Sequence, residues 1–354
     1  MASPQVVSNQ TLRIVDANLN RIGEGLRLLE DTARLLLDNA ALSQQLKSMR
    51  HRLEVSDPAL KQRLLQARNA AGDVGINLQA AEQAADRDLA STVIANTRRV
   101  QQSLRVIEEM AKIPAIQLDS EVFKKARFDL YTIERELTSR LLRRDKVECL
   151  RGLYAVIDTA RLKGCGHKEM AEQLIEGGAS AIQLRDKTTP KNELLPIAIE
   201  LQVLCAEKGV LFIVNDHLDI ALAAAADGLH IGPEDLPLVD ARRLLPIDRI
   251  IGYSATSADQ ATAAEEGGAD YVAASGVFAT DSKEAVEPIG LSGLRQISNR
   301  VKIPVVAIGG INPDNAAEVL AAGAVAIAAI SALLGAESPV EAARQMAEII
   351  EKQR

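Results

Sequence analysis

The spacing of apolar residues indicates helices in the first part of the chain. From residue 8 to about residue 144, apolar residues recur every three or four positions, which places them on one face of a helix. The first such series is Leu12, Val15, Leu19, Ile22, Leu26 and Leu29. Three prolines, Pro4, Pro58 and Pro114, interrupt the pattern, and residues 120–144 read as one long helix. This part is predicted to be all-helical, with the polar stretch 143–147 as its junction to the rest.

From residue 152 onward, short apolar runs alternate with stretches of helical period. The runs predicted as strands cover residues 153–158, 181–185, 210–215, 228–232, 250–254, 271–275, 304–309 and 325–330. Several helices between them end in Gly-Ala directly before the next strand, a common way for a helix to turn into a parallel strand. Eight such units predict an α/β fold, a (β/α)8 TIM barrel. A doubly wound open sheet is the alternative, and the lack of a GxGxxG motif after the first strand disfavours it.

Length and charge agree with two different halves. The 354 residues suit two domains, which we place at residues 1–147 and 148–354. Residues 1–150 hold 23 Lys and Arg against 20 Asp and Glu, a net charge of +3. Residues 151–354 hold 18 against 28, a net charge of −10.

Composition excludes several classes of protein. Aromatic residues make up 2% of the chain and Trp is absent, which argues against stacking platforms for nucleic acid. Three cysteines without a CxxC pair exclude a disulfide framework. The sequence has no apolar run long enough to span a membrane and no apolar signal segment at its start. We therefore expect a cytoplasmic protein that binds neither nucleic acid nor membrane.

The helical half contains an internal repeat. Residues 17–34 align with residues 95–112 at a constant offset of 78, and seven positions are identical, four of them Leu26/Leu104, Arg21/Arg99, Arg27/Arg105 and Glu30/Glu108. We expect the two helices to pack as a pseudo-symmetric pair with the repeated Leu and Ala facing the core. The repeated Arg then have two readings, as surface ion pairs or as a clamp for phosphate. The loop at residues 68–75, which carries two glycines, is a second candidate for close approach to a ligand.

In TIM barrels the chemistry lies at the carboxyl ends of the strands, and these positions are strongly polar here. Gln183, Arg185 and Lys187 alternate at the end of the second strand, so their side chains leave on the same side. Two cations at that place suit a pyrophosphate group, Arg as a planar fork and Lys as a point charge. The alternative reading is a solvated strand end.

Carboxylates and glycines follow the other strands. Asp216 and Asp235 come after neighbouring strands, and two carboxylates together with pyrophosphate oxygens are ligands that Mg²⁺ prefers. Their alternative reading is as helix N-caps. Gly309 and Gly310, with Ser331 after the last strand, lie at the usual phosphate site of these barrels. Glycine that serves only to turn the chain is the alternative there.

These residues together indicate group transfer with pyrophosphate as the leaving group. The loop after the sixth strand adds Thr280, Ser282 and Lys283. A mouth with three cations, two carboxylates and a phosphate cup has room for two anionic substrates and a metal ion. His217 and His230 lie beside strand ends, where a hydrogen-bonding role is commoner than catalysis, so we assign no general base.

The barrel half resembles the thiamine-phosphate synthase family over about residues 152–350. The motifs that carry the resemblance are QLRDK (183–187), VNDHLDIALAAAADGLHIGPEDLP (214–237), IIGYSATS (250–257), GADYVAASGVFATDSK (268–283), PVVAIGGIN (304–312) and AIS (329–331). The resemblance implies an enzyme that joins 4-amino-5-hydroxymethyl-2-methylpyrimidine pyrophosphate to 4-methyl-5-(2-hydroxyethyl)thiazole phosphate. The products are thiamine phosphate and pyrophosphate, and Mg²⁺ is the implied cofactor.

The resemblance also implies roles for single residues. The metal ligands are Asp216 and Asp235. The residues implied in catalysis are Arg185, Lys187, Ser254 and Lys283. Those around the pyrimidine and its pyrophosphate are Gln183, Arg185, Lys187, Asn215, Ser254 and Lys283. Those on the thiazole phosphate side are Thr280, Ser282, Gly310, Ile330 and Ser331.

The mechanism implied is dissociative. Pyrophosphate departs with the help of Mg²⁺ and the cations, and the thiazole nitrogen captures the pyrimidinylmethyl cation that is left. Such a reaction needs charge stabilisation and positioning rather than a general base. Two alternatives are a thiazole tautomerase-like barrel that acts by proton transfer and a non-catalytic sensor of phosphorylated ligands. Both are disfavoured by the joint presence of Arg185, Lys187, Asp216, Asp235 and Lys283.

The helical half resembles the domain fused ahead of this synthase in some bacteria, including cyanobacteria. Its motifs are NRIGEGLRLLEDTAR (20–34), ARNAAGDVG (67–75) and RRVQQSLRVIEEMAK (98–112). The resemblance implies phosphorylation of hydroxymethylpyrimidine phosphate, with ATP as co-substrate. The candidate residues are Arg21, Arg27, Arg68, Asp73, Arg99 and Arg105. A structural or dimerising module is the alternative, and homo-oligomer formation stays open.

Overall fold

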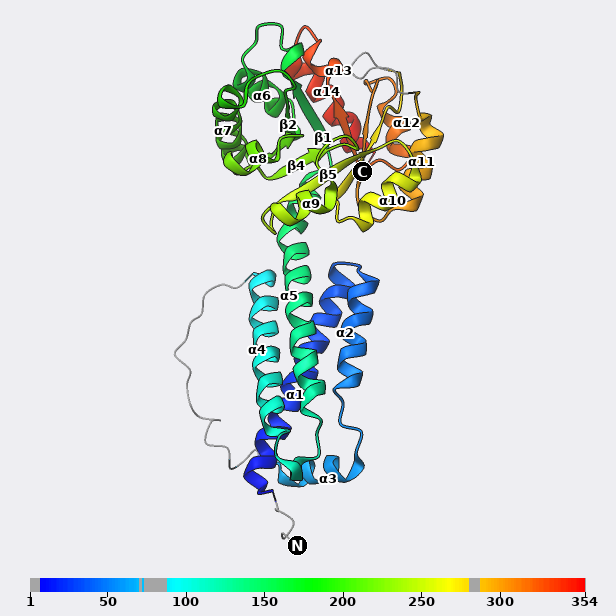
Figure 1. The fold of residues 1–354 in the computed structure, drawn as a ribbon. Helices are drawn as coiled ribbons and strands as arrows, with labels where there is room; N and C mark the ends of the chain where they lie inside the picture. The colour runs from blue at the N-terminus through cyan, green and yellow to red at the C-terminus, as the bar shows by residue number, and fades with distance from the viewer. Residues whose placement is uncertain (1–6, 70–71, 73–87, 280–286, 354) are drawn as a thin grey trace. The chain divides into compact units, whose positions relative to one another are not determined.

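The chain divides into two compact units after Leu142 in the computed structural model, which describes residues 7–69, 72, 88–279 and 287–353 (Figure 1). The sequence placed this boundary five residues later, between residues 147 and 148. The structure confirms the fold class, because a helical unit comes first and a closed parallel barrel follows it.

The first unit is built of amphipathic helices. Their bounds are α1 (Asn9–Asp31), α2 (Ala40–Arg52), α3 (Pro58–Ala67), α4 (Leu89–Met110) and α5 (Ser120–Cys149), with a π turn η1 (Thr32–Leu36) and a 3-10 turn η3 (Pro114–Ile116). Polar side chains begin four of these helices, because Ser8, Asn39, Asp57 and Asp88 accept hydrogen bonds from the free N–H groups of the first turn. Pro58 occupies the first helical position, where its missing N–H costs nothing.

The two helices that carry the internal repeat, α1 and α4, lie against each other. They approach closely at Gly25, where a Cβ atom would lie 2.2 Å from Val100 Cγ2. Asn96 Nδ2 donates a hydrogen bond of 3.1 Å to Gly25 O across the same contact. The repeated Leu26 and Leu104 are fully buried in the core of the unit. The repeat therefore supplies the central helix pair of this unit.

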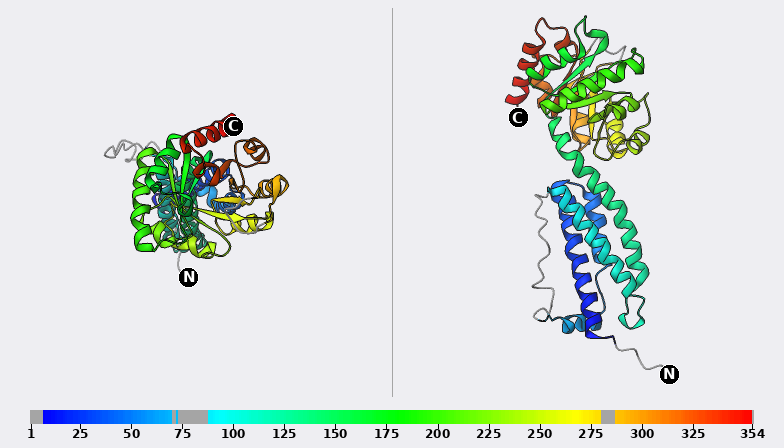
Figure 2. Two further views of the ribbon diagram at one scale, coloured as in Figure 1. Left: turned by 90° about the horizontal axis from the view of Figure 1, so that it is seen from above. Right: turned by 90° about the vertical axis from the view of Figure 1, so that its left-hand side faces the viewer.

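The second unit is a TIM barrel of eight parallel strands in sequential order. The strands are β1 (Leu153–Asp158), β2 (Ala179–Arg185), β3 (Leu211–Asn215), β4 (Gly228–Ile231), β5 (Ile250–Ala255), β6 (Tyr271–Ser275), β7 (Val305–Ile308) and β8 (Ala326–Ala329). The helices are α6 (His167–Glu176), α7 (Lys191–Lys208), α8 (Leu218–Ala223), α9 (Leu238–Leu244), α10 (Ala258–Glu266), α11 (Gly290–Arg300), α12 (Ala316–Ala321), α13 (Ser331–Leu334) and α14 (Pro339–Lys352), with a 3-10 turn η4 (Thr159–Arg161). Figure 2 shows the helices around the outside of the strands.

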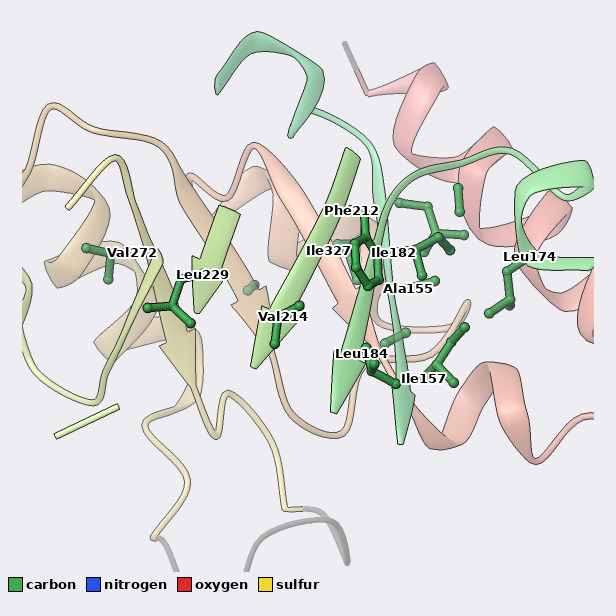
Figure 3. Packing of buried hydrophobic residues seen from close by; sticks show 14 of the residues in the cluster. Ala155, Ile157, Leu174, Ile182, Leu184, Phe212, Val214, Leu229, Val272 and Ile327 are labelled. Carbon is green, nitrogen blue, oxygen red and sulfur yellow. The ribbon is translucent and has the colours of Figure 1, made fainter. Parts of the chain in front are cut away.

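Alternate residues of each strand face opposite sides of the barrel wall. On β1, Ala155 and Ile157 belong to the outer layer between strands and helices, where Leu174 of α6 also lies (Figure 3). Tyr154 and Val156 of the same strand belong to a separate cluster inside the barrel. The strands are buried on both faces, which explains why they read as nearly continuous apolar runs.

The last turns of α5 belong to the barrel unit. Arg143 Nε lies 2.8 Å from Asp270 Oδ1, directly before β6, and Lys146 Nζ lies 3.3 Å from Asp227 Oδ1, directly before β4. Leu150, which follows the helix, is fully buried in the cluster inside the barrel. The polar stretch 143–147, expected as the junction, directly follows the boundary between the units; it is helical and contacts the amino-terminal ends of the strands.

Among the described residues, no helix is both long and apolar enough to cross a membrane.

Candidate active site

A cavity opens at the carboxyl ends of the barrel strands, and all eight strands contribute to its lining. This is where the chemistry of TIM barrels is found. Many of the residues predicted from the sequence line it, namely Gln183, Arg185, Asn215, Ser254, Gly310, Ile330 and Ser331. Tyr154 and His230 lie deeper in the same lining. The strand periodicity thus brings residues up to 177 positions apart in sequence, Tyr154 and Ser331, to one cavity.

Arg185, at the end of β2, is held by a carboxylate that sequence reasoning missed. Its Nη1 donates a hydrogen bond to Asp158 Oδ2 at the end of β1, and Asp158 is buried. Asp158 Oδ1 accepts a second hydrogen bond, of 3.1 Å, from Ala160 N in the turn η4. The sequence did contain a sign of this role for Asp158. It is the acidic last residue of an otherwise apolar strand, and other strands carry predicted site residues at the same end.

The segment after β2 turns sharply into α7. Asp186 is buried, and its Oδ1 accepts hydrogen bonds of 2.9 and 2.7 Å from Thr188 N and Thr189 N. Burial alone would raise the pKa of the Asp186 carboxyl, but these hydrogen bonds outweigh it and lower that pKa well below its ordinary value. Lys187 is exposed beyond the strand end. Arg185 lines the cavity, whereas Lys187 is not part of the lining. The positive charge of Lys187 instead lowers the pKa of the nearby Asp216.

Asp216 and Asp235 face each other. Burial and the nearby charge of Asp235 raise the pKa of Asp216 to about 6, although the positive charge of Lys187 works in the opposite direction. Asp235 Oδ2 accepts a hydrogen bond of 2.7 Å from Gly232 N. Neither Asp caps a helix, because His217 precedes α8 and Pro237 precedes α9.

This pair fits a divalent cation. A carboxylate whose pKa is raised by burial and by a second carboxylate, as that of Asp216 is by Asp235, also attracts a cation that relieves the repulsion between the two. No cluster of three or more His, Cys, Asp or Glu side chains suited to a metal occurs in the described part of the chain. A site of two carboxylates suits Mg²⁺, which keeps few protein ligands and takes further oxygens from water and phosphate.

The two histidines near the strand ends, His217 and His230, both make hydrogen bonds. His230 Nε2 lies 3.0 Å from Ser254 Oγ, and its Nδ1 lies 3.1 Å from Tyr271 Oη. His217 Nε2 lies 3.1 Å from Asp186 O. These contacts agree with the structural roles predicted for both residues.

The glycine turn after β7 closes the other side of the cavity. Gly309 and Gly310 have φ of 113° and 62°, in the left-handed region that favours glycine. A Cβ on Gly310 would lie 2.5 Å from Ala279 O and 2.8 Å from Phe278 Cβ. The turn is thus packed against the segment after β6, and Ser331 begins α13 beside it. Thr280, Ser282 and Lys283 lie outside the described residues.

The candidate arginines of the helical unit fall into two groups. Arg68 pairs with Asp16 at 2.7 and 3.0 Å, and Arg105 pairs with Glu108 and Glu109 at 2.6 Å. The others are exposed and have no ion-pair partner among the described residues, namely Arg21, Arg27 and Arg99. Arg27 lines a hollow together with Arg50, which lies 3.0 Å from Glu30. Asp73 lies outside the described residues.

Comparisons with known proteins agree with both halves. A family model described as thiamine monophosphate synthase matches residues 153–333, and a model of the ThiD2 family matches residues 13–136. A thiamine-phosphate synthase from Thermosynechococcus vestitus is 37% identical over 347 residues, which cover 97% of this chain and 96% of that one. The thiamine-phosphate synthase of Moorella thermoacetica is 51% identical over 203 residues, 57% of this chain and 97% of that one.

A solved structure resembles the barrel. The thiamine phosphate pyrophosphorylase from Pyrococcus furiosus is 45% identical, with a TM-score of 0.54, and the match covers 59% of this chain and 98% of that one. The matches confirm the family suggested by the motifs, and they confirm that the chain is an enzyme. The chain belongs to the thiamine-phosphate synthase family, in its long form with an N-terminal helical domain.

Proposed function

We propose that the barrel joins 4-amino-5-hydroxymethyl-2-methylpyrimidine pyrophosphate to 4-methyl-5-(2-hydroxyethyl)thiazole phosphate, releasing thiamine phosphate and pyrophosphate. One observation carries the proposal. Residues predicted for the pyrimidine, its pyrophosphate and the thiazole phosphate line a single cavity, from Gln183 on one side to Ser331 on the other. Two substrates that react with each other must meet in one space.

The cations stabilise the departing pyrophosphate. Arg185 offers a planar fork of donors whose orientation is set by Asp158. Lys187 adds a point charge near Asp216, and Lys283 is proposed for the same leaving group. Asp216 and Asp235 would hold Mg²⁺, which supplies positive charge to the pyrophosphate oxygens when it is bound.

The remaining residues bind and orient. Gln183, Asn215 and Ser254 are proposed to contact the pyrimidine and its leaving group, and Gly310 and Ser331 the thiazole phosphate. Departure of pyrophosphate leaves a pyrimidinylmethyl cation, and the thiazole nitrogen donates its lone pair to the methylene carbon. No proton has to be removed from either substrate before the new bond forms. That both nitrogens of His230 already make hydrogen bonds supports a mechanism without a general base.

The test mixes the full chain with both substrates and Mg²⁺ and measures pyrophosphate and thiamine phosphate. We expect both products in equal amounts. Isomerisation of a thiazole without pyrophosphate release would indicate the tautomerase alternative, and binding without turnover would indicate the sensor. Arg185→Gln should lower turnover strongly, whereas Arg243→Gln, which alters an exposed ion pair with Asp240, should not.

We also propose that the helical unit phosphorylates hydroxymethylpyrimidine phosphate, with ATP as co-substrate. The match to the ThiD2 family supports this assignment, and so do the exposed arginines of α1 and α4. The full chain, given ATP, thiazole phosphate and the pyrimidine monophosphate, should then form thiamine phosphate. Formation from the pyrophosphate only would favour the structural module.

A pair of variants localises this activity. Arg27→Gln should lower the use of the monophosphate and leave the use of the pyrophosphate unchanged. The control is Arg34→Gln, whose side chain is exposed in an ion pair with Asp31 and should affect neither. The cytoplasmic location and the absence of a nucleic-acid partner stay predictions.

A further inference from the structure

A continuous chain of hydrogen bonds crosses the interior of the barrel. Gln183 Nε2 donates to Tyr154 Oη at 2.8 Å, and Tyr154 Oη lies 2.8 Å from Tyr271 Oη. Tyr271 Oη lies 3.1 Å from His230 Nδ1, and His230 Nε2 lies 3.0 Å from Ser254 Oγ. The chain thus connects Gln183 on β2 with Ser254 on β5, two residues that line the cavity.

The barrel interior provides space for these hydrogen-bonded side chains and buries them. All its members are buried, and both tyrosines are at most 1% exposed. A Cβ at position 252 would lie 2.0 Å from Tyr271 Cζ, so Gly252 on the neighbouring strand leaves the space that the phenol ring fills. Burial raises the pKa of both tyrosines, so both keep their hydroxyl hydrogen. Each can then donate one hydrogen bond and accept another.

The chemistry of the groups gives the chain a direction. An amide nitrogen only donates, so Tyr154 accepts from Gln183 and has its own hydrogen left for Tyr271. Tyr271 in turn donates to His230 Nδ1. A neutral His230 then carries its hydrogen on Nε2 and donates it to Ser254 Oγ.

We propose that Tyr154, Tyr271 and His230 are positioning residues that fix opposite hydrogen-bonding roles for the two groups facing the substrate, Gln183 as an acceptor and Ser254 as a donor. At one end, the nitrogen of Gln183 is engaged by Tyr154, which leaves the oxygen of the same amide to act in the cavity that Gln183 lines. No group in the described part of the chain donates to that oxygen. At the other end, Ser254 accepts from His230 and keeps its hydroxyl hydrogen for an acceptor in the cavity.

These roles select the chemistry of the substrate ring. An acceptor at Gln183 binds a ring that carries an amino group and disfavours a ring with an oxo group in its place, because two acceptors would then face each other. This part of the inference rests on the proposed function, in which the pyrimidine carries such an amino group.

This series of hydrogen bonds has one alternative arrangement, in which every donor and acceptor is exchanged. If the Gln183 amide were turned around, every hydrogen bond would reverse, and His230 would carry its hydrogen on Nδ1. The two states therefore differ in the tautomer of a single histidine, which can be measured without any substrate.

The first experiment determines that tautomer in the full chain. The protein is labelled with ¹⁵N in its four histidines, and the His230 signals are assigned by their loss in His230→Asn. We expect the hydrogen on Nε2 at neutral pH, and a mixture of tautomers in Tyr271→Phe. A hydrogen on Nδ1, or on both nitrogens, in the unaltered chain would overturn the proposal.

The second experiment compares the pyrimidine pyrophosphate with its 4-oxo analogue. In Tyr154→Phe the amide of Gln183 is released, so the preference for the amino compound in kcat/KM should fall by about tenfold or more. Tyr253→Phe is the matched control, because Tyr253 lies beside Ser254 on the same strand but belongs to the outer layer, and it should leave the preference unchanged. Equal losses for both compounds in Tyr154→Phe would mean a merely structural role and would overturn the proposal.

The two experiments separate the two levels of inference. If the unaltered chain forms no thiamine phosphate from the amino compound, the proposed function fails. The tautomer of His230 still decides whether the chain of hydrogen bonds has the direction inferred.

Discussion

Asp270 offers a sharp test of how the barrel is closed at its amino-terminal side. This carboxylate lies directly before β6 and contacts two guanidinium groups, Arg143 Nε at 2.8 Å and Arg242 Nη1 at 2.9 Å. Its Oδ2 also accepts a hydrogen bond of 2.8 Å from Ile251 N. The substitution Asp270→Asn keeps the shape of the side chain and removes its charge.

The size of the effect follows from burial. The side chains of Asp270 and Arg143 are each 9% exposed, and that of Arg242 is 18% exposed. Burial already lowers the pKa of Arg242 to about 10, with the charge of Asp270 opposing that effect. Without the carboxylate, two buried cations would face each other, and the new amide N–H₂ would point at a donor. Removing one partner of a buried ion pair costs about 3–5 kcal/mol, and we expect a loss in this range.

The assay is urea unfolding of the full chain, followed by near-ultraviolet circular dichroism. Three of the four tyrosines, Tyr154, Tyr253 and Tyr271, belong to the barrel, so this signal reports on barrel unfolding. The control Asp240→Asn removes an exposed ion pair with Arg243 and should change the unfolding free energy by less than about 1 kcal/mol. A loss below about 1 kcal/mol for Asp270→Asn would refute the reasoning, because the carboxylate would then not be needed to neutralise the buried arginines.

Further predictions concern the mouth of the barrel. Gly310→Ala and Gly290→Ala both place a Cβ on a residue with φ of 62°. Only at Gly310 do neighbouring atoms lie within 3 Å of the new Cβ. In steady-state kinetics, Gly310→Ala should therefore raise KM for thiazole phosphate by about tenfold or more, whereas Gly290→Ala should not. The pKa of Asp216 is about 6 in the folded chain against an ordinary value of 3.8. Its contribution to stability is therefore fully present below pH 3.8 and is lost as pH rises through about 6; without Mg²⁺, the unfolding free energy of Asp216→Asn should lack this fall. Lys283→Ala should lower kcat by about a hundredfold or more, and near-normal turnover would remove Lys283 from the mechanism.

Much of the barrel could be predicted from the sequence because its strands are buried on both faces. The runs at 153–158 and 271–275 coincide with β1 and β6, and the other six strands differ from their predictions by at most two residues at either end. The end of the long helix was harder. Residues 143–147 are polar in sequence, but ion pairs and Leu150 bind this segment to the barrel, and such tertiary contacts have no local signature.

Residues of the candidate site could be predicted from the sequence where they lie at the carboxyl ends of the strands. Gln183 and Arg185 line the cavity as their alternation indicates. Lys187 follows the same alternation in sequence, yet the chain leaves the strand at Arg185, so its side chain is exposed outside the lining. Asp158 was missed because its role depends on Arg185 from another strand. The hydrogen bonds through Tyr154 and Tyr271 depend on Gly252, because the Tyr271 ring fills the space that a side chain at position 252 would need. The sequence alone does not show that these two residues are neighbours.

The helix α5 has a consequence for limited proteolysis. The boundary between the two units falls after Leu142, inside a helix that continues without a break to Cys149. Proteases cleave segments that can unfold locally over several residues, and they attack exposed loops far more readily than hydrogen-bonded helices. Arg143 and Arg144 provide trypsin with suitable side chains, but Arg143 is buried in an ion pair and the backbone around both is helical. Trypsin should therefore spare this boundary, and the two units should stay on one polypeptide under conditions that cut flexible loops.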